Sequence, residues 1–266
     1  MPEGHTVHRT ANQFNELFSS KPIEISSPQG RFASGATLIS GRKLLAAKAI
    51  GKQLFLNFDN DLTLRIHLGI YGKWAFSKLS DEGLPDPIGE VRARFANQDH
   101  FADLRGPTVC EVISVDEVST IEKRLGPDPL NPDPTGAEFE RFAVRAAKSK
   151  TPIGQLLMNQ EAISGIGNVY RAELLFRAGI NPYRPANHLT REELAALWQD
   201  SVKLLKVGVK KGVMITRDEL LTRNPTKSER NFVYKREGLN CRVCKTHVAI
   251  EIMATRKLYF CPSCQR

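Results

Sequence analysis

Apolar residues alternate with polar ones through much of the first half of the chain. Residues 53–58 read Gln-Leu-Phe-Leu-Asn-Phe, the Asp-Asn-Asp of 59–61 turns the chain, and the alternation resumes over 62–66. Residues 91–101 repeat this arrangement around a polar turn. Period-two patterns separated by turn residues are typical of hairpins in a sheet with one buried face. The sequence therefore predicts a sheet-rich first half.

A helix is predicted ahead of these strands, near residues 5–18. After them, residues 126–136 hold four prolines and two glycines, a composition that excludes a continuous helix and most strand pairing. We interpret this segment as a linker. The fold predicted for residues 1–125 is a β-sandwich-like domain with a flanking helix.

Helical signals dominate after the linker. Residues 137–148 and 169–178 are predicted helices, and the Thr-Arg-Glu-Glu of 190–193 is a capping box that begins a third. Gly212 is placed to end that third helix. We therefore predict a helical domain over residues 126–235.

A Gly-x-Gly turn precedes the second of these helices. Gly165 and Gly167 allow close approach of the backbone, and Asn168 is placed as the N-cap of a helix that begins at Val169. Amide groups at a helix start, beside an Asn side chain, form a site suited to a backbone phosphate. A tight corner between two helices is the competing interpretation.

Four cysteines lie near the end of the sequence in two Cys-x-x-Cys pairs. Sixteen residues separate Cys241 and Cys244 from Cys261 and Cys264, which is the spacing of a tetrahedral zinc site. Four thiolates leave no position for an activated water, so the predicted Zn²⁺ is structural and holds residues 236–266 as a small basic finger. Two disulfide bonds are the alternative, and they need an oxidising compartment.

Charge and hydropathy narrow the class of protein. The formal net charge of +9 and the isoelectric point near 9.4 favour a polyanionic partner. Residues 1–20 contain no stretch typical of a secretory signal, and no run approaches the roughly 20 apolar residues of a membrane span. We therefore expect a cytoplasmic protein with reduced cysteines, in which Cys110 is a buried small hydrophobic residue.

The first residues indicate covalent chemistry. In Met1-Pro2-Glu3 the small second residue favours removal of the initiator methionine, which would expose the secondary amine of Pro2. An α-amino group has a pKa of about 7.7–8.0, so a useful fraction is an unprotonated nucleophile at neutral pH. With an aldehydic sugar carbon it gives a cationic iminium, and the neighbouring carboxyl of Glu3 can donate a proton to the sugar ring oxygen. A plain start before a helix is the alternative.

Taken together, these motifs resemble the formamidopyrimidine-DNA glycosylase and endonuclease VIII family. The resemblance rests on Pro-Glu-Gly at 2–4, Lys52, the run that begins at His67, the turn from Gly165 to Asn168 and the four-cysteine finger, in this order. It implies an N-terminal β-sandwich, a helix-two-turns-helix domain and a zinc finger, with double-stranded DNA bound between the lobes. It also implies excision of oxidised bases and cleavage of the strand at the abasic site that results.

The resemblance implies roles for individual residues as well. Pro2 matches the Schiff-base nucleophile and Glu3 the catalytic acid. Lys52 matches a lysine that acts in β-elimination, and Arg256 matches a finger arginine that grips phosphate and acts in δ-elimination. The residues that match DNA contacts are Arg124, Asn168 and His67. The plainer interpretation is a solvated charge for the lysine and for Arg124, and a structural histidine for His67.

Ile70 and Tyr71 occupy the loop where endonuclease VIII-like members carry Gln-Leu-Tyr to fill the hole left by an extruded base. We predict that both side chains wedge or stack in the duplex, with core packing beside Trp74 as the alternative. Gly69 stands where those members have the polar residue that meets the orphaned base, which leaves the opposite-base preference open. His5 stands where many relatives have proline.

Tyr71 and the pattern from Arg256 to Cys261 favour the endonuclease VIII branch, which implies oxidised pyrimidines as substrates. The predicted protein is a bifunctional DNA glycosylase/AP lyase, monomeric and associated with the nucleoid. A non-catalytic zinc-finger protein that recognises damaged or abasic DNA is the alternative, and it follows if Met1 is retained. A zinc hydrolase is a third class, and a ligand set of four cysteines argues against it.

Overall fold

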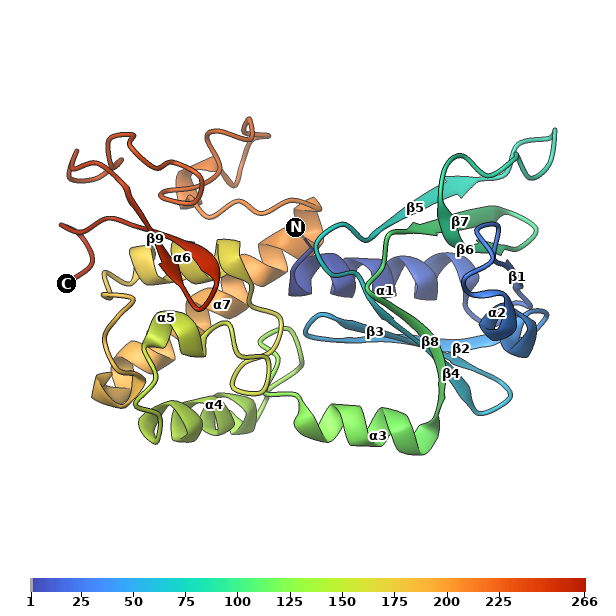
Figure 1. Cartoon of the computed structure of the whole chain (residues 1–266), viewed down its shortest axis with the longest axis horizontal. Helices are drawn as coiled ribbons and strands as arrows, with labels where there is room; N and C mark the ends of the chain where they lie inside the picture. The colour runs from blue at the N-terminus through green and yellow to red at the C-terminus, as the bar shows by residue number, and fades with distance from the viewer. Residues whose placement is uncertain (1) are drawn as a thin grey trace. The chain divides into compact units, whose positions relative to one another are not determined.

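The computed structural model describes residues 2–266, so the predicted removal of Met1 lies outside the described residues. Its internal contacts divide the chain into two compact units, Met1–Arg124 and Leu125–Arg266 (Figure 1). We call them the N-terminal unit and the C-terminal unit. None of the helices within residues 2–266 has the length and apolar character that a membrane crossing requires.

Two four-stranded antiparallel sheets form the N-terminal unit. One sheet has the order β1-β6-β7-β5 and the other β2-β3-β4-β8. The strands predicted at 53–58, 62–66 and 91–101 are confirmed as β3, β4 and the β6–β7 hairpin. The strands of the unit are β1 (Glu24–Ser26), β2 (Leu44–Ile50), β3 (Gln53–Phe58), β4 (Leu62–His67), β5 (Lys73–Lys78), β6 (Val91–Ala96), β7 (His100–Arg105) and β8 (Val109–Ser114).

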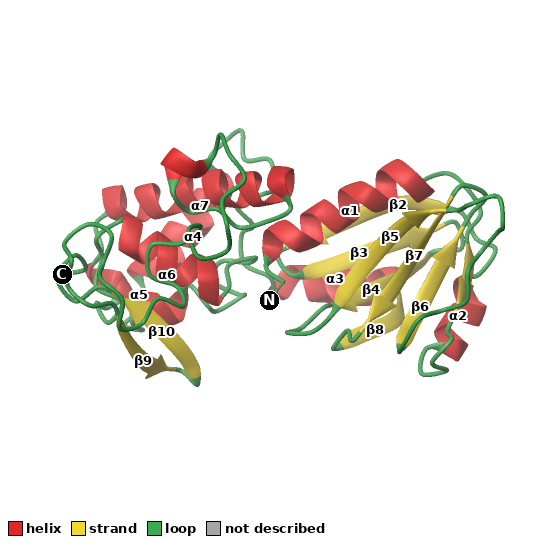
Figure 2. Cartoon of the chain, turned by 90° about the horizontal axis from the view of Figure 1, so that it is seen from above, coloured by secondary structure: helices red, strands yellow, loops and turns green. Residues whose placement is uncertain are grey.

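Helix α1 (Gly4–Phe18) confirms the helix predicted ahead of the strands. It lies alongside β2 (Figure 2), and its Asn15 side chain exchanges two hydrogen bonds with the main chain of Ala47. Its Phe14 ring reaches the other sheet, with a centroid 4.8 Å from that of Trp74. Because α1 contacts both sheets, the helix is fixed against the sandwich. Two further helices, which the sequence pattern did not predict, are α2 (Ala33–Ile39) and α3 (Val115–Arg124).

Helices dominate the C-terminal unit, which ends in a two-stranded hairpin. The predicted capping box is present, since the Thr190 hydroxyl accepts from the Glu193 amide and the Glu193 carboxylate accepts from the Thr190 amide. Gly212 ends that helix with φ of 71°. The elements are α4 (Ala137–Ala147), α5 (Ile153–Leu156), α6 (Asn168–Arg177), η1 (Ala186–His188), α7 (Arg191–Lys211), η2 (Asp218–Leu220), β9 (Ala249–Met253) and β10 (Arg256–Phe260).

The proline-rich segment is irregular, as predicted, but it is not a free linker. Gly126 donates its amide hydrogen to the Gln160 carbonyl at 2.9 Å, and the Pro127 carbonyl accepts from the Ser164 amide at 2.9 Å. Residues 126–129 are buried. The start of this segment therefore belongs to the packed C-terminal unit.

The finger shares a hydrophobic core with the helical part of the C-terminal unit. Ala172 and Phe176 of α6 pack with Val233, Val248 and Tyr259. These contacts join residues predicted as separate helical and finger domains. The three-part division at 125 and 235 remains a prediction.

Candidate functional site

The predicted nucleophile and acid lie just before the first residue of α1. Glu3 is the N-cap residue, with extended backbone (φ −129°, ψ −177°), and its carbonyl accepts from the Thr6 amide at 2.9 Å. Its side chain is fully buried, while Pro2 is half-buried. A carboxyl group shielded from water directly after Pro2 is suited to proton transfer at a reaction centre next to the chain terminus.

Lys52 and His67 lie close together at the ends of neighbouring strands. Lys52 is in the turn before β3, and the register of β3 and β4 pairs Gln53 with His67. Burial, and then the positive charges of Lys52 and Arg65, lower the pKa of His67 below its usual 6.5. Its Nδ1 accepts from the Gly69 amide at 3.1 Å, as a neutral imidazole nitrogen can.

The same end of the N-terminal unit holds the start of α1 and the turn between β2 and β3 (Figures 1 and 2). The structure therefore places Pro2 and Glu3 at the end that carries Lys52 and His67. Arg124 is exposed at the last position of α3. Its predicted DNA contact remains a prediction.

The loop after β4 exposes both predicted wedge residues. Ile70 is 47% and Tyr71 is 84% exposed, so the alternative of core packing beside Trp74 is wrong. Gly69 adopts a left-handed conformation with φ of 63°, and a Cβ atom there would lie 1.8 Å from Thr108 Oγ1. The backbone conformation of the loop and the nearby Thr108 therefore require glycine at position 69. The loop leaves the side chains of Ile70 and Tyr71 exposed.

His5 follows the predicted nucleophile and acid and is almost fully buried, with 3% of its surface exposed. Burial, and secondarily the positive charge of the chain terminus, lower its pKa from 6.5 to about 4. Thr6 Oγ1 lies 3.2 Å from its Nε2. The imidazole is thus neutral at physiological pH.

This lowered pKa predicts an acid-sensitive N-terminal unit. Below pH 6.5 the unfolded chain binds a proton at His5, whereas the folded chain does not until about pH 4. The contribution of His5 to the free energy of unfolding is therefore fully present above pH 6.5. It is lost as the pH falls toward 4, which lowers the free energy of unfolding by up to about 3 kcal/mol. In a His5→Gln variant, the free energy of unfolding should fall less between these pH values. Trp74 fluorescence in a Trp198→Phe background reports the N-terminal unit, since the chain has two tryptophans.

The matched control is His188→Gln, at an exposed position of the C-terminal unit. It should keep the full acid-induced loss seen with Trp74. An unchanged pH dependence in His5→Gln would contradict the assignment.

Asn168 anchors the finger hairpin. Helix α6 begins at Asn168 and its N-cap is Gly167, so the prediction of Asn168 as N-cap is wrong by one residue. The Asn168 side chain instead donates from Nδ2 to the Lys257 carbonyl at 2.9 Å. It also accepts from Arg171, whose Nη2 donates to the same carbonyl at 2.9 Å. The amide therefore positions the hairpin next to Arg256, and its phosphate contact remains a prediction.

The hairpin presents Arg256 from a strained turn. Ala254 and Thr255 both have positive φ, 48° and 64°, and Met253 pairs with Arg256 across the turn. Two left-handed residues form the turn type that matches strand twist but favours Asn-Gly. A β-branched residue in this conformation is costly, and such strain is concentrated at functional sites. Arg256, whose side chain is exposed, is the first residue after this turn.

The four cysteines meet in one cluster. Their Sγ atoms all lie within 4.8 Å of one another, with 3.9 Å between Cys241 and Cys264 and 3.3 Å between Cys244 and Cys261. Tetrahedral bonds of about 2.3 Å to zinc place sulfurs about 3.8 Å apart, whereas a disulfide requires about 2.05 Å. The alternative of two disulfides is therefore wrong, and the cluster could hold a metal ion. The fifth cysteine, Cys110, lies outside it, and burial raises its pKa to about 12.

Gln265 fastens this cluster to the helical part of the unit. Its Oε1 accepts from the Cys261 amide at 2.9 Å, and its Nε2 donates to the Ile180 carbonyl at 3.1 Å. The side chain is 2% exposed. A metal ion bound by the cluster would thereby be linked to the loop that follows α6.

Two charged residues of α6 were missed by the sequence reasoning. Arg171 and Glu173 are fully buried, although they stand in the run Val-Tyr-Arg-Ala-Glu-Leu-Leu-Phe. The signal that could have found them is two charged residues within an otherwise apolar helix. Charged side chains are buried only where other groups compensate the charge, so this pattern indicates buried side chains with partners.

Comparisons with known proteins give the same family for both halves of the chain. The family model of the formamidopyrimidine-DNA glycosylase N-terminal domain matches residues 1–110, and that of the formamidopyrimidine-DNA glycosylase H2TH domain matches residues 125–219. The protein named Endonuclease 8 1 of Mycobacterium tuberculosis is 43% identical over 270 residues, covering 100% of both chains. The formamidopyrimidine-DNA glycosylase of Pelotomaculum thermopropionicum is 30% identical, covering 100% of this chain and 98% of that protein.

Among solved structures, the MutM (Fpg) protein of Thermus thermophilus superposes with a TM-score of 0.79 at 27% identity, covering 99% of this chain and 98% of the other. This likeness confirms the predicted fold class: a β-sandwich unit, a helix-two-turns-helix region and a cluster of four cysteines that could bind zinc. The resemblance drawn from the sequence motifs is also confirmed. The chain belongs to the formamidopyrimidine-DNA glycosylase and endonuclease VIII family.

Proposed function

We propose that the protein is a bifunctional DNA glycosylase/AP lyase of base excision repair that uses Pro2 as its nucleophile. The observation that carries this proposal is the fully buried carboxyl of Glu3 directly after Pro2, at the anchored start of α1. The turn between β2 and β3, which contains Lys52, lies at the same end of the unit (Figure 1). The named relatives, an endonuclease 8 and a formamidopyrimidine-DNA glycosylase, support the same activity.

Base removal uses the amine and the acid together. Glu3 gives its proton to the sugar ring oxygen as the ring opens, and the Pro2 nitrogen bonds to C1′. The bond from C1′ to the base breaks, and the base leaves with the electron pair. The proton lost by the amine balances the one taken up by the base, which leaves a cationic iminium on the opened sugar.

Strand cleavage follows from that positive charge. The iminium withdraws electrons from C2′, so Lys52 can remove a C2′ proton while the bond from C3′ to its phosphate oxygen breaks. Arg256, at the hairpin tip, is the residue proposed to assist the second elimination, which releases the 5′ phosphate. Water then hydrolyses the iminium and restores the Pro2 amine.

Binding of double-stranded DNA is assigned to positive charge and to the finger. The net charge of +9 attracts a polyanion, and Asn168 holds the hairpin that carries Arg256.

We propose that one structural Zn²⁺ fills the four-cysteine cluster, because the sulfur spacing fits tetrahedral thiolate coordination. Phosphate contacts are proposed for Arg124, Asn168 and His67. Ile70 and Tyr71 are proposed to fill the space left by the extruded base.

The proposed substrates are oxidised pyrimidines in duplex DNA. The 43% identity to a protein named Endonuclease 8 1, against 30% to a named formamidopyrimidine-DNA glycosylase, favours this branch. We further propose a monomer that acts on chromosomal DNA in the nucleoid.

Borohydride reduction of the protein mixed with an abasic duplex tests the proposal. The reductant traps the iminium as a stable amine, so a covalent protein–DNA adduct is expected. Mass analysis of the adduct should place the DNA on Pro2. The competing non-catalytic DNA-binding protein gives no adduct even when mass analysis shows Pro2 at the terminus.

A further inference from the structure

The loop that joins β5 to β6 runs along the whole length of β7. Strand β5 ends at Lys78, opposite His100 at the start of β7. Strand β6 begins at Val91, opposite Arg105 at the end of β7. The connecting residues, which we call the 79–90 loop, therefore pass from one end of β7 to the other.

A buried ion pair fixes the middle of this loop to the outer face of the sheet. Phe95 of β6 and Leu104 of β7 belong to the core of the unit. Because side chains alternate along a strand, Arg94 and Asp103, which pair across these strands, point to the opposite face. Both are at least 95% buried, and Arg94 binds Asp103 at 2.7 and 2.9 Å. Arg94 also donates to the Pro85 carbonyl, so the loop covers this pair.

A second arginine of the same face fixes the end of the loop. Arg105 donates from Nε and Nη2 to the Ile88 carbonyl at 3.0 and 2.9 Å, and its Nη2 also lies 2.9 Å from Asp103 Oδ2. The rings of Pro85 and Pro87 fix two φ angles between these attachments. The main chain of the loop is therefore held in one conformation by the sheet beneath it.

The side chains of the loop, in contrast, face solvent. All ten residues from 81 to 90 are exposed, and Ile88 is 81% and Leu84 48% exposed. Single exposed apolar residues are ordinary, but here four of the five residues from 84 to 88 are apolar. A backbone that is already fixed lowers the entropy cost of burying such side chains against another molecule. The loop is therefore suited to binding.

The charge of the loop indicates what kind of molecule it binds. Residues 79–90 contain four acidic residues and no basic one, in a chain whose net charge is +9. A segment of this charge repels DNA and anionic lipid surfaces. It is complementary to a protein surface on which Lys and Arg side chains surround an apolar groove. The acidic residues are Asp81, Glu82, Asp86 and Glu90.

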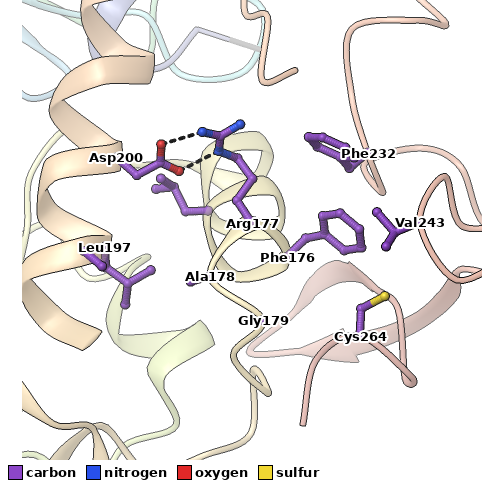
Figure 3. A pocket seen from close by; sticks show the side chains of 11 residues that line it. Phe176, Arg177, Ala178, Gly179, Leu197, Asp200, Phe232, Val243 and Cys264 are labelled. Atoms are coloured by element: carbon purple, nitrogen blue, oxygen red, sulfur yellow. Dashed lines mark hydrogen bonds and ion pairs between the residues drawn. The ribbon is translucent and has the colours of Figure 1, made fainter. Parts of the chain in front are cut away.

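A hollow in the C-terminal unit gives no comparable indication. A pocket of about 630 Å³ lies beside α6 and α7, where the Phe176 and Phe232 rings stack with centroids 5.0 Å apart (Figure 3). Its Arg177 and Asp200 form a two-point ion pair at 2.6 and 2.8 Å. Since these two charges compensate each other, they do not select an occupant, whereas the charge of the 79–90 loop does.

We propose that the 79–90 loop is a docking segment for a basic partner protein. The partner takes Ile88 and Leu84 into an apolar groove, and cationic side chains around that groove face the carboxylates of the loop. This inference is independent of the proposed lyase chemistry, because the residues proposed to carry that chemistry lie outside the loop.

Photo-crosslinking of the full-length protein in the cells from which the chain comes is the first step of the test. The photoreactive amino acid p-benzoylphenylalanine replaces Ile88, and irradiation should give a covalent adduct with a protein of basic isoelectric point, identified by mass. The matched control carries the same group at Val115. This residue is 60% exposed in the same unit but lies outside the loop, so it should not give that adduct.

Binding of the captured protein, purified on its own, is the deciding measurement. Ile88→Ser should weaken its affinity at least about tenfold, whereas Val115→Ser should change it less than about twofold. Asp81→Asn combined with Glu82→Gln should weaken it about threefold or more and make it less dependent on salt. Arg105→Gln leaves the side chains of the loop unchanged but removes both hydrogen bonds to its main chain, so affinity should fall by about threefold or more.

Three results would overturn the inference. One is no adduct at position 88 beyond that at position 115, and another is equal affinity of the captured protein for Ile88→Ser and the unsubstituted protein. The third is an adduct with a second copy of this chain, which would assign the loop to self-association. Thermal unfolding and abasic-site nicking should be unchanged in Ile88→Ser, which shows that the fold is intact. Absence of nicking in the unsubstituted protein would refute the proposed function and not the docking segment.

Discussion

One extra residue placed ahead of Pro2 is expected to reduce borohydride trapping and abasic-site nicking by about 10³-fold or more. The extension turns the secondary amine into an amide, which cannot form an iminium. The buried Glu3 and the rest of α1 keep their places, because the helix is anchored by Phe14 and Asn15 rather than by the terminus. Gel quantification of the trapped adduct provides the measurement.

Binding to an uncleaved duplex is the internal control for this variant. The affinity, and the slope of its logarithm against salt concentration, should stay close to those of the unextended protein, since the charges proposed to contact phosphate are untouched. The unextended protein, shown by intact mass to begin at Pro2, is the reference. Trapping at the reference level in the extended protein would move the nucleophile to another residue.

Cys261→Ser is expected to release the metal and weaken duplex binding by about tenfold or more. A hydroxyl is a poor zinc ligand, and the buried Cys261 belongs to the core that the finger shares with Ala172 and Phe176 of α6. Loss of the cluster therefore also disturbs the hairpin that presents Arg256. Zinc content per chain and duplex affinity at one fixed salt concentration are the two measurements.

Cys110→Ala is the matched control for this variant, because it removes a cysteine that lies outside the cluster. It should retain one zinc per chain and full affinity. If Cys261→Ser kept its metal and its affinity, or if chelation changed neither fold nor binding, the structural-zinc assignment would be wrong.

Local patterns predicted the parts of the fold that depend on neighbouring residues. The alternation at 53–58, the capping box at 190–193 and the two Cys-x-x-Cys pairs each encode a structure within a short stretch, and all three are present. Strand β1 and helix α2 were missed. Each is short, and β1 is held by a partner distant in the sequence, since it pairs with β6.

The side-chain contacts of the candidate site were harder to predict, because they also join residues that are distant in the sequence. Asn168 was expected to cap its own helix, but its amide is taken by Lys257, 89 residues further on. Glu173 binds amides about 60 residues away, and nothing in its flanking sequence specifies them. Interactions of this kind depend on the completed packing, which a pattern within one segment does not contain.

The attachments of residues 265 and 266 and the proposed role of Pro2 constrain how the protein can be tagged. The Gln265 side chain bridges Cys261 and Ile180, and the Arg266 amide donates to the Gly179 carbonyl at 3.2 Å. An affinity tag fused directly after Arg266 would lie next to these attachments, and a tag before Pro2 would block the amine proposed as the nucleophile. A purification handle is therefore best joined behind Arg266 through a flexible spacer and removed before metal content is measured.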